Sequence, residues 1–148
     1  MLNWPGSLLL AHPPRRIIMG DQFPEPSGGA HLRTIAMPRD ANASGDIFGG
    51  WTLSQMDLAG GTFAVNHSGK RVVTVHIEAV EFLKPVSVGD DVSVFCWLEE
   101  EGNTSVKVRM ETWARARAAG APHKVTEGIF TYVAVDEDGK PQPIADKT

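Results

Sequence analysis

One helical segment followed by four long alternating segments constrains the fold of this chain more than any other feature. The stretch from residue 50 to about residue 66 has apolar residues at helical spacing and is predicted to be the only long helix. A short alternating segment at 31–36 precedes it, and longer ones follow at 71–82, 92–98, 106–116 and 125–135. Short turns join the long segments, which implies antiparallel neighbours. We therefore predict an α+β fold in which an antiparallel sheet curls around one central helix.

Two adjacent glycines, Gly60 and Gly61, lie inside the predicted helix. Each costs a helix interior about 1 kcal/mol relative to alanine. Such a cost is typical of a position where another chain segment comes very close. We therefore expect another backbone, for instance a strand of the sheet, to approach the helix there.

The segment 71–82 carries a predicted irregularity. Val73, Val75 and Ile77 alternate with polar residues and are expected to share one face. The phase then shifts toward Val80, which predicts a β-bulge near residues 78–79.

Because the strands keep one face apolar beyond what a single helix covers, we also expect a dimer or larger assembly.

Composition narrows the possible functions and locations. The net charge of −4 and the pI near 5.7 argue against a protein that holds nucleic acid by bulk electrostatics. No apolar run reaches the roughly 18 to 20 residues of a membrane span, and the early burst at 8–11 is too short for a signal peptide. We therefore expect a soluble, cytoplasmic protein. The single cysteine, Cys96, excludes an intrachain disulfide and any CxxC motif.

The chain is expected to form one domain. Residues 1–30 are rich in Pro and Gly, show no sustained periodicity and are predicted to be a flexible leader. The domain itself is predicted at 31–143, with a short tail at 144–148.

The most informative segment for chemistry places Asp46 just before Gly49 and Gly50, which open the predicted helix. Unpaired N–H groups at a helix start point outward, with the positive end of the helix dipole behind them. Glycine lets a ligand approach such donors, and this is the geometry of an oxyanion hole. An adjacent carboxylate can activate water or attack an acyl carbon itself. The simpler alternative is that Asp46 only caps the helix.

The segment around Asp46 resembles the signature of the YciA-like acyl-CoA thioesterases, which have the hotdog fold. The resemblance covers nearly all of 34–143 in order, through 42–57, 71–75, Glu78, 82–86, 88–90, 102–106, 111–113, 131–136 and 139–141. It implies a five-stranded antiparallel sheet around a central helix, with active sites between paired subunits. It also implies hydrolysis of acyl-CoA thioesters without metal or other cofactor, commonly by hexamers that are trimers of dimers.

The resemblance assigns expected roles to individual residues. Asp46 is expected to act as general base or nucleophile, and Asn42 to orient water or the thioester. The backbone N–H of Gly49 or Gly50 is expected to stabilise the oxyanion. Asp57, in the Met-Asp pair of the signature, is the second catalytic candidate, and its alternative is a buried carboxylate bonded to nearby backbone. The expected substrate contacts are Phe48, Arg71, Thr104 and Ser105.

Several other side chains have weaker expected roles. The basic candidates for the phosphates of coenzyme A are Arg71, Lys84, Lys107, Arg109, Arg115 and Arg117. His76 departs from the family pattern, which more often has a small apolar residue there; it is either a surface histidine or a residue lining the acyl channel. The histidines lack metal-ligand spacing, and neither HExxH nor GxSxG occurs.

Two rival functions remain open from the sequence. One is a hotdog hydratase or dehydratase, which would rely on a positioned histidine with a carboxylate; the loop before the helix offers no such histidine. The other is a non-catalytic acyl-CoA binding or sensor protein. A pure binder has no need of an acid ahead of Gly49 and Gly50, so Asp46 favours the hydrolase.

Overall fold

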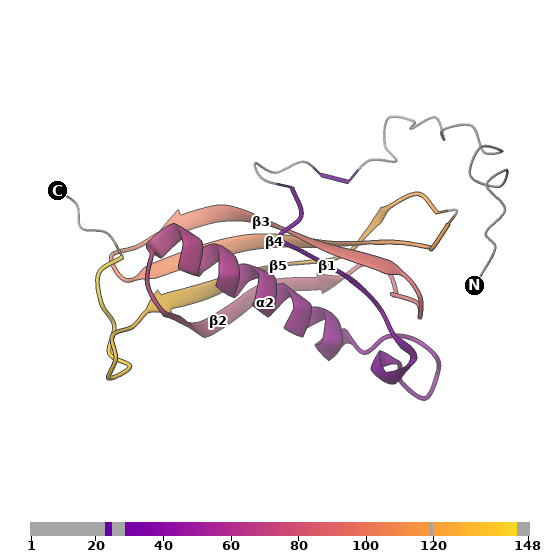
Figure 1. Ribbon diagram of the computed structural model, residues 1–148, viewed down its shortest axis with the longest axis horizontal. Helices are drawn as coiled ribbons and strands as arrows, with labels where there is room; N and C mark the ends of the chain where they lie inside the picture. Colours follow the sequence, from indigo (N-terminus) through magenta and orange to yellow (C-terminus); the bar gives the residue numbers. More distant parts are fainter. Residues whose placement is uncertain (1–22, 25–28, 119, 145–148) are drawn as a thin grey trace, which may run out of the picture.

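The computed structural model describes residues 23–24, 29–118 and 120–144 as a five-stranded antiparallel sheet with one long helix along its inner face (Figure 1). The sheet has the order β1-β3-β4-β5-β2, and each neighbouring pair is antiparallel. The elements are β1 (Leu32–Ile35), the 3₁₀ helix η1 (Pro38–Asp40), α2 (Gly49–Ser68), β2 (Val72–Phe82), β3 (Asp91–Glu101), β4 (Ser105–Arg115) and β5 (His123–Ala134). The predicted α+β architecture is confirmed.

Helix α2 extends slightly beyond its predicted bounds. It begins at Gly49, after Phe48 at the N-cap, and ends at Ser68, before Gly69 in the left-handed conformation with φ 66°. The Gly69 N–H donates to the Val65 carbonyl oxygen, which closes the last turn. Its 20 residues span about 30 Å, so the two ends of the helix reach opposite ends of the sheet.

The core lies between α2 and the inner face of the sheet. Met56 and Ala59 of the helix pack against a buried cluster drawn from three strands: Val94, Cys96, Val106, Val108, Met110, Phe130 and Tyr132. Cys96 is a buried strand residue, and burial raises the pKa of its thiol to about 12. Its role as a small apolar core residue follows, because the thiol stays protonated at neutral pH.

Strand β2 forms one edge of the sheet and contains two irregularities. Its register against β5 shifts between Glu78 and Glu81, where Ala79 has φ 53°, so the predicted bulge near 78–79 is confirmed. A second shift lies between Thr74 and His76.

The second shift changes which side chains of β2 share a face. Val73 pairs with Val133 on the outer face, whereas Ile77 pairs with Phe130, whose side chain is in the core. The prediction that Val73 and Ile77 share a face is therefore wrong, because an extra residue between them reverses the alternation. The apolar side chains that this edge leaves exposed are Val73, Val75, Ile77, Phe82 and Leu83.

Phe23, ahead of β1, packs on the outer face of the sheet. Its ring centre lies 5.8 Å from that of Phe95 and 6.4 Å from that of Trp113. The guanidinium groups of Arg33 and Arg115 lie 5.3 and 5.5 Å from the same ring centre. Most of the predicted leader and tail lies outside the described residues, so those boundaries stay predictions. In the part of the chain that the structure describes, no helix is long and apolar enough to cross a membrane.

The glycine pair in α2 meets side chains of the sheet, not its backbone as expected. A Cβ at Gly60 would overlap the Tyr132 hydroxyl and lie 2.9 Å from Met110 Sδ and Cε. A Cβ at Gly61 would meet only Tyr132 Cε1, at an ordinary 3.8 Å. The requirement for glycine is therefore confined to position 60.

The two positions should respond oppositely to alanine. Gly61→Ala should raise the free energy of unfolding by about 0.5 to 1 kcal/mol, because alanine loses less backbone entropy in a helix. Gly60→Ala should lower it by about 1 to 3 kcal/mol, because the methyl group overpacks the core. Denaturant unfolding of both variants checks this, and equal effects of the same sign would contradict the packing described.

Candidate active site

The loop that carries Asp46 is shaped by Asn42. The Asn42 side-chain oxygen accepts hydrogen bonds from the backbone N–H groups of Ser44, at 2.9 Å, and Asp46, at 3.1 Å. The Asn42 N–H donates in turn to the Asp46 carbonyl oxygen at 2.7 Å. Asn42 therefore holds the backbone of the loop that presents Asp46, while a direct role toward water or the thioester stays a prediction.

The residue after Asp46 anchors this loop to the protein. Ile47 is buried in a second apolar cluster with Ala36 and Val86, and its N–H donates to the Val86 carbonyl oxygen at 3.0 Å. Asp46 itself forms an isolated backbone bridge with Ser87. The backbone on either side of the carboxylate is thus fixed, although the Asp46 side chain is exposed.

Asp46 does not cap the helix. The N-cap residue is Phe48, which makes no side-chain capping bond, and no acidic residue lies in the first turn. The Asp46 carboxylate has no hydrogen-bond or ion-pair partner among the described residues. The capping alternative is therefore wrong, and the carboxylate is free to meet a ligand.

Unpaired donors stand at the start of α2, close to Asp46 in sequence. The N–H groups of Trp51 and Thr52 reach the Phe48 carbonyl oxygen at 3.1 and 3.4 Å, whereas those of Gly49 and Gly50 have no backbone acceptor within the described chain. The Phe82 ring would lie 3.1 Å from a Cβ at Gly49, while a Cβ at Gly50 would meet nothing within 4 Å.

A pocket adjoins this helix start. Its volume is about 330 Å³, and its lining is mainly apolar: Ile47, Gly49, Thr52, Phe82, Leu83, Lys84, Pro85, Val86 and Thr126. Phe48, expected to contact substrate, is 54% exposed at the N-cap. An exposed carboxylate, free helix-start donors and an apolar hollow therefore occur together, which suits an acyl group with a carbonyl carbon open to attack.

Asp57 lies eight residues further along α2 than Gly49, about 12 Å away along the axis. Its Oδ1 accepts hydrogen bonds from the Thr74 hydroxyl at 2.7 Å and the Tyr132 hydroxyl at 3.1 Å. The side chain is half-buried and lines a pocket of about 370 Å³ with Leu58, Gly61, Thr62, Val65, Val72, Thr74 and Tyr132. The alternative of a carboxylate bonded to nearby backbone does not hold, because its partners are two side-chain hydroxyls.

Within one chain, three predicted substrate contacts lie far from Asp46. Arg71 follows the C-terminal end of α2, and its carbonyl oxygen accepts the Val135 N–H at 2.9 Å. The Thr104 carbonyl oxygen accepts the Ala134 N–H at 2.8 Å, and Ser105 begins β4 next to it. These residues therefore stand at the opposite end of the helix from Gly49, and the structure does not bring them to Asp46.

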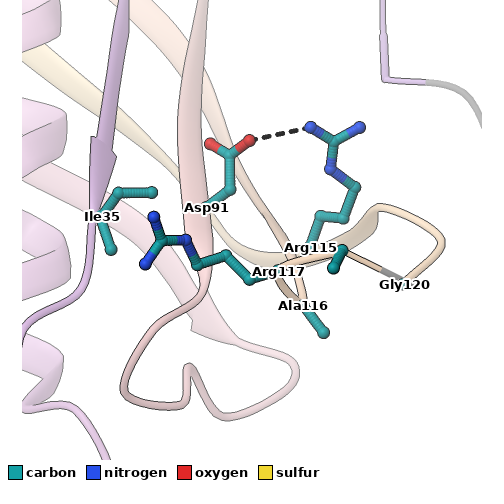
Figure 2. A pocket seen from close by; sticks show the side chains of 7 residues that line it. Ile35, Asp91, Arg115, Ala116, Arg117 and Gly120 are labelled. Atoms are coloured by element: carbon teal, nitrogen blue, oxygen red, sulfur yellow. Dashed lines mark hydrogen bonds and ion pairs between the residues drawn. The ribbon is translucent and has the colours of Figure 1, made fainter. Parts of the chain in front are cut away.

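Two of the basic candidates for phosphate binding share a pocket. Arg115 and Arg117 line a hollow of about 420 Å³ with Asp91, and Figure 2 shows Arg115 paired to the Asp91 carboxylate. The Arg115 Nη2 to Asp91 Oδ2 distance is 3.0 Å, while Arg117 is exposed and makes no ion pair within the described chain. The other strand cations are engaged: Lys107 with Glu78 and Glu100, and Arg109 with Glu99, Glu111 and the Trp97 ring.

His76 lies on the outer face of the edge strand, away from the core. It pairs with Thr131, is mostly exposed, and its Nε2 is 3.8 Å from Glu78 Oε2. In residues 23–24, 29–118 and 120–144, no three His, Cys, Asp or Glu side chains are grouped so as to hold a metal ion.

Sequence reasoning missed Thr74 and Tyr132 as partners of Asp57. The available signal was Gly60, because a glycine in a helix interior marks a close approach. The sequence near Gly60 gives no indication that the group close to it is Tyr132 of β5.

Comparison with known proteins places these features in a family context. The sequence model of the thioesterase superfamily matches residues 44–121. Acyl-CoA thioester hydrolase YciA of Escherichia coli K12 is 48% identical over 122 residues, which cover 80% of this chain and 92% of that protein.

Solved structures agree with this match. The hexameric thioesterase of Yersinia pestis is 45% identical with a TM-score of 0.75, covering 81% of this chain and 98% of that one. An acyl-CoA hydrolase from Staphylococcus aureus, solved with butyryl coenzyme A and coenzyme A, is 27% identical with a TM-score of 0.70, covering 76% and 68%.

Proposed function

The chain belongs to the thioesterase superfamily, and we propose that it hydrolyses acyl-CoA thioesters to a free carboxylic acid and coenzyme A. The observation that carries the proposal is the unpartnered Asp46 carboxylate beside the free N–H groups of Gly49 and Gly50. Relatives named as acyl-CoA thioester hydrolases, and a neighbour solved with butyryl coenzyme A, support the substrate class.

In the proposed reaction Asp46 acts as a general base or as a nucleophile. As a base it takes a proton from water while the water oxygen bonds to the thioester carbonyl carbon. The carbonyl oxygen gains charge and is stabilised by the N–H of Gly49 or Gly50. The carbon–sulfur bond then breaks, and the coenzyme A thiolate recovers the proton from Asp46. In the nucleophilic variant the Asp46 carboxylate bonds to the carbonyl carbon and the carbon–sulfur bond breaks, which gives a mixed anhydride and the coenzyme A thiolate; water then cleaves the anhydride, and a proton from that water goes to the thiolate.

The active site is proposed to be completed by a second subunit paired through β2. This strand has an unpaired edge in the described chain and exposes Val75 and Ile77. Two copies related by a twofold axis can pair these edges antiparallel, which removes the edge and covers apolar surface. The pairing lays Val72 of one copy beside Phe82 of the other.

The twofold pairing reconciles the separated site residues. It carries Arg71 of the partner subunit toward the helix start that bears Asp46, together with Thr104 and Ser105 of the partner subunit. Phe48 and these three residues are proposed to contact the substrate. Three such dimers would form a hexamer, and the Yersinia pestis neighbour is hexameric.

Asp57 is the second catalytic candidate in this arrangement. Its pocket adjoins Val72 and Thr74, at the end of β2 that faces the partner's Asp46 loop in the proposed dimer. The hydratase alternative loses support, because the described histidines are placed elsewhere: His31 beside Cys96, His67 paired with Glu101, His76 on the outer face and His123 at the start of β5.

Removal of the Asp46 carboxylate tests the proposed chemistry. Asp46→Asn should keep the fold but lower kcat for acyl-CoA by about 10² to 10⁴-fold, the usual contribution of a positioned acid or base. Thiol release from short-, medium- and long-chain acyl-CoAs measures this.

Asp138→Asn, in the exposed hairpin after β5, is the matched control and should leave kcat unchanged. Asp46→Asn with unchanged turnover would contradict the assigned role. Saturable acyl-CoA binding by the native protein without thiol release would instead favour the binding protein.

Alanine variants of two arginines test where the coenzyme A phosphates bind. Arg71→Ala should raise KM for acyl-CoA about tenfold, the loss of one charge-assisted contact, and should leave KM for the phosphate-free acyl-pantetheine unchanged. Arg117→Ala is the matched comparison at the pocket of Figure 2. If KM for acyl-CoA rises in Arg117→Ala and not in Arg71→Ala, the nucleotide binds at the Arg117 pocket and the role proposed for Arg71 is contradicted.

A further inference from the structure

Tyr132, the only tyrosine in the chain, reaches across the core to helix α2. Its side chain is 1% exposed and points into the core from β5, between β4 and the edge strand β2. Its hydroxyl lies 3.1 Å from Asp57 Oδ1 and 3.3 Å from the Asp57 carbonyl oxygen. A central core residue is thereby bonded to an ionisable group at a pocket.

The Asp57 carboxylate is held from two strands at once. Thr74 on β2 and Tyr132 on β5 both donate to Oδ1, at 2.7 and 3.1 Å. The other oxygen, Oδ2, has no hydrogen-bond partner in the described chain, and Asp57 lines the pocket of about 370 Å³. Two donors on one oxygen restrict rotation of the carboxylate and leave the second oxygen available as an acceptor.

The Tyr132 hydroxyl requires a glycine at position 60, and glycine is less favourable than alanine in a helix interior. A Cβ at position 60 would overlap the hydroxyl, so a residue other than glycine could not stand there without displacing Tyr132. Met110 Sδ and Cε would lie 2.9 Å from the same Cβ, so the hydroxyl and Met110 together require glycine at this position. Burial, then the charge of Asp57, raise the pKa of Tyr132, so the phenol keeps its proton and remains a donor.

We infer that Tyr132 is a positioning residue, whose hydroxyl with that of Thr74 fixes Asp57 so that its free oxygen accepts a hydrogen bond from the attacking water. This inference rests on the proposed function, because the water is the one that Asp46 of the partner subunit deprotonates. Tyr132 itself touches neither water nor thioester and acts through Asp57.

A double-mutant cycle separates positioning from packing. Tyr132→Phe should lower kcat about tenfold with KM changed less than twofold, because an interaction in the reacting state is lost. Asp57→Asn should lower kcat at least as much. The double variant should be no slower than Asp57→Asn, because the hydroxyl acts only through that carboxylate.

Thr112→Val is the matched control for loss of a buried hydroxyl. Thr112 Oγ1 is buried and has no hydrogen-bond partner among the described residues, so its removal should leave kcat unchanged. The inference is overturned if Tyr132→Phe turns over like the native protein, or if the losses of the two single variants multiply in the double variant.

A second measurement does not depend on turnover. Since the chain has one tyrosine, its ¹³Cζ resonance is unambiguous, and its chemical shift at neutral pH reports the hydrogen bond from the hydroxyl to Asp57 Oδ1. The resonance should move in Asp57→Asn and stay in place in Thr112→Val. An unmoved resonance in Asp57→Asn overturns the inference, whereas a moved one, with a native protein that hydrolyses no acyl-CoA, leaves the hydrogen bond standing and refutes the proposed function.

Discussion

Helix α2 packs into the concave face of the sheet, and this contact holds the two elements together around one core. Met56, Ala59 and Gly60 meet Met110 and Tyr132 there. This contact fixes the helix along its axis and about it. The helix start therefore stands beside the Asp46 loop, and the Asp57 side of the helix turns toward β2.

Much of this architecture was predictable, because hydrophobic period and turn spacing are local properties. The helix, the strands and the bulge near Ala79 follow from the alternation of residues, and the resemblance to YciA-like thioesterases with the hotdog fold is confirmed. The faces of Val73 and Ile77 were not predictable, because a second shift between Thr74 and His76 has no distinct sequence signal. The sequence predicted that another segment lies close to Gly60. It did not predict that this segment contributes the Tyr132 side chain, because Tyr132 is 72 residues away in sequence.

The site residues divide in the same way. Asp46, Gly49 and Gly50 are close in sequence, and the structure keeps them together at the helix start. Arg71, Thr104 and Ser105 stand at the other end of a helix about 30 Å long. In the described chain these two groups therefore lie apart. The proposed twofold dimer would bring them together across β2, an edge strand of the described chain that exposes Val75 and Ile77.

In the proposed dimer each active site combines Asp46 of one subunit with Asp57 of the partner subunit. The most direct test is thiol release by hybrid dimers of Asp46→Asn and Asp57→Asn subunits, isolated through two different affinity tags. Each hybrid should have one intact site and recover about half of the native activity per dimer, since the twofold pairing generates two equivalent sites. Hybrids no more active than the two parent variants would contradict the claim and place both carboxylates in the same subunit's site.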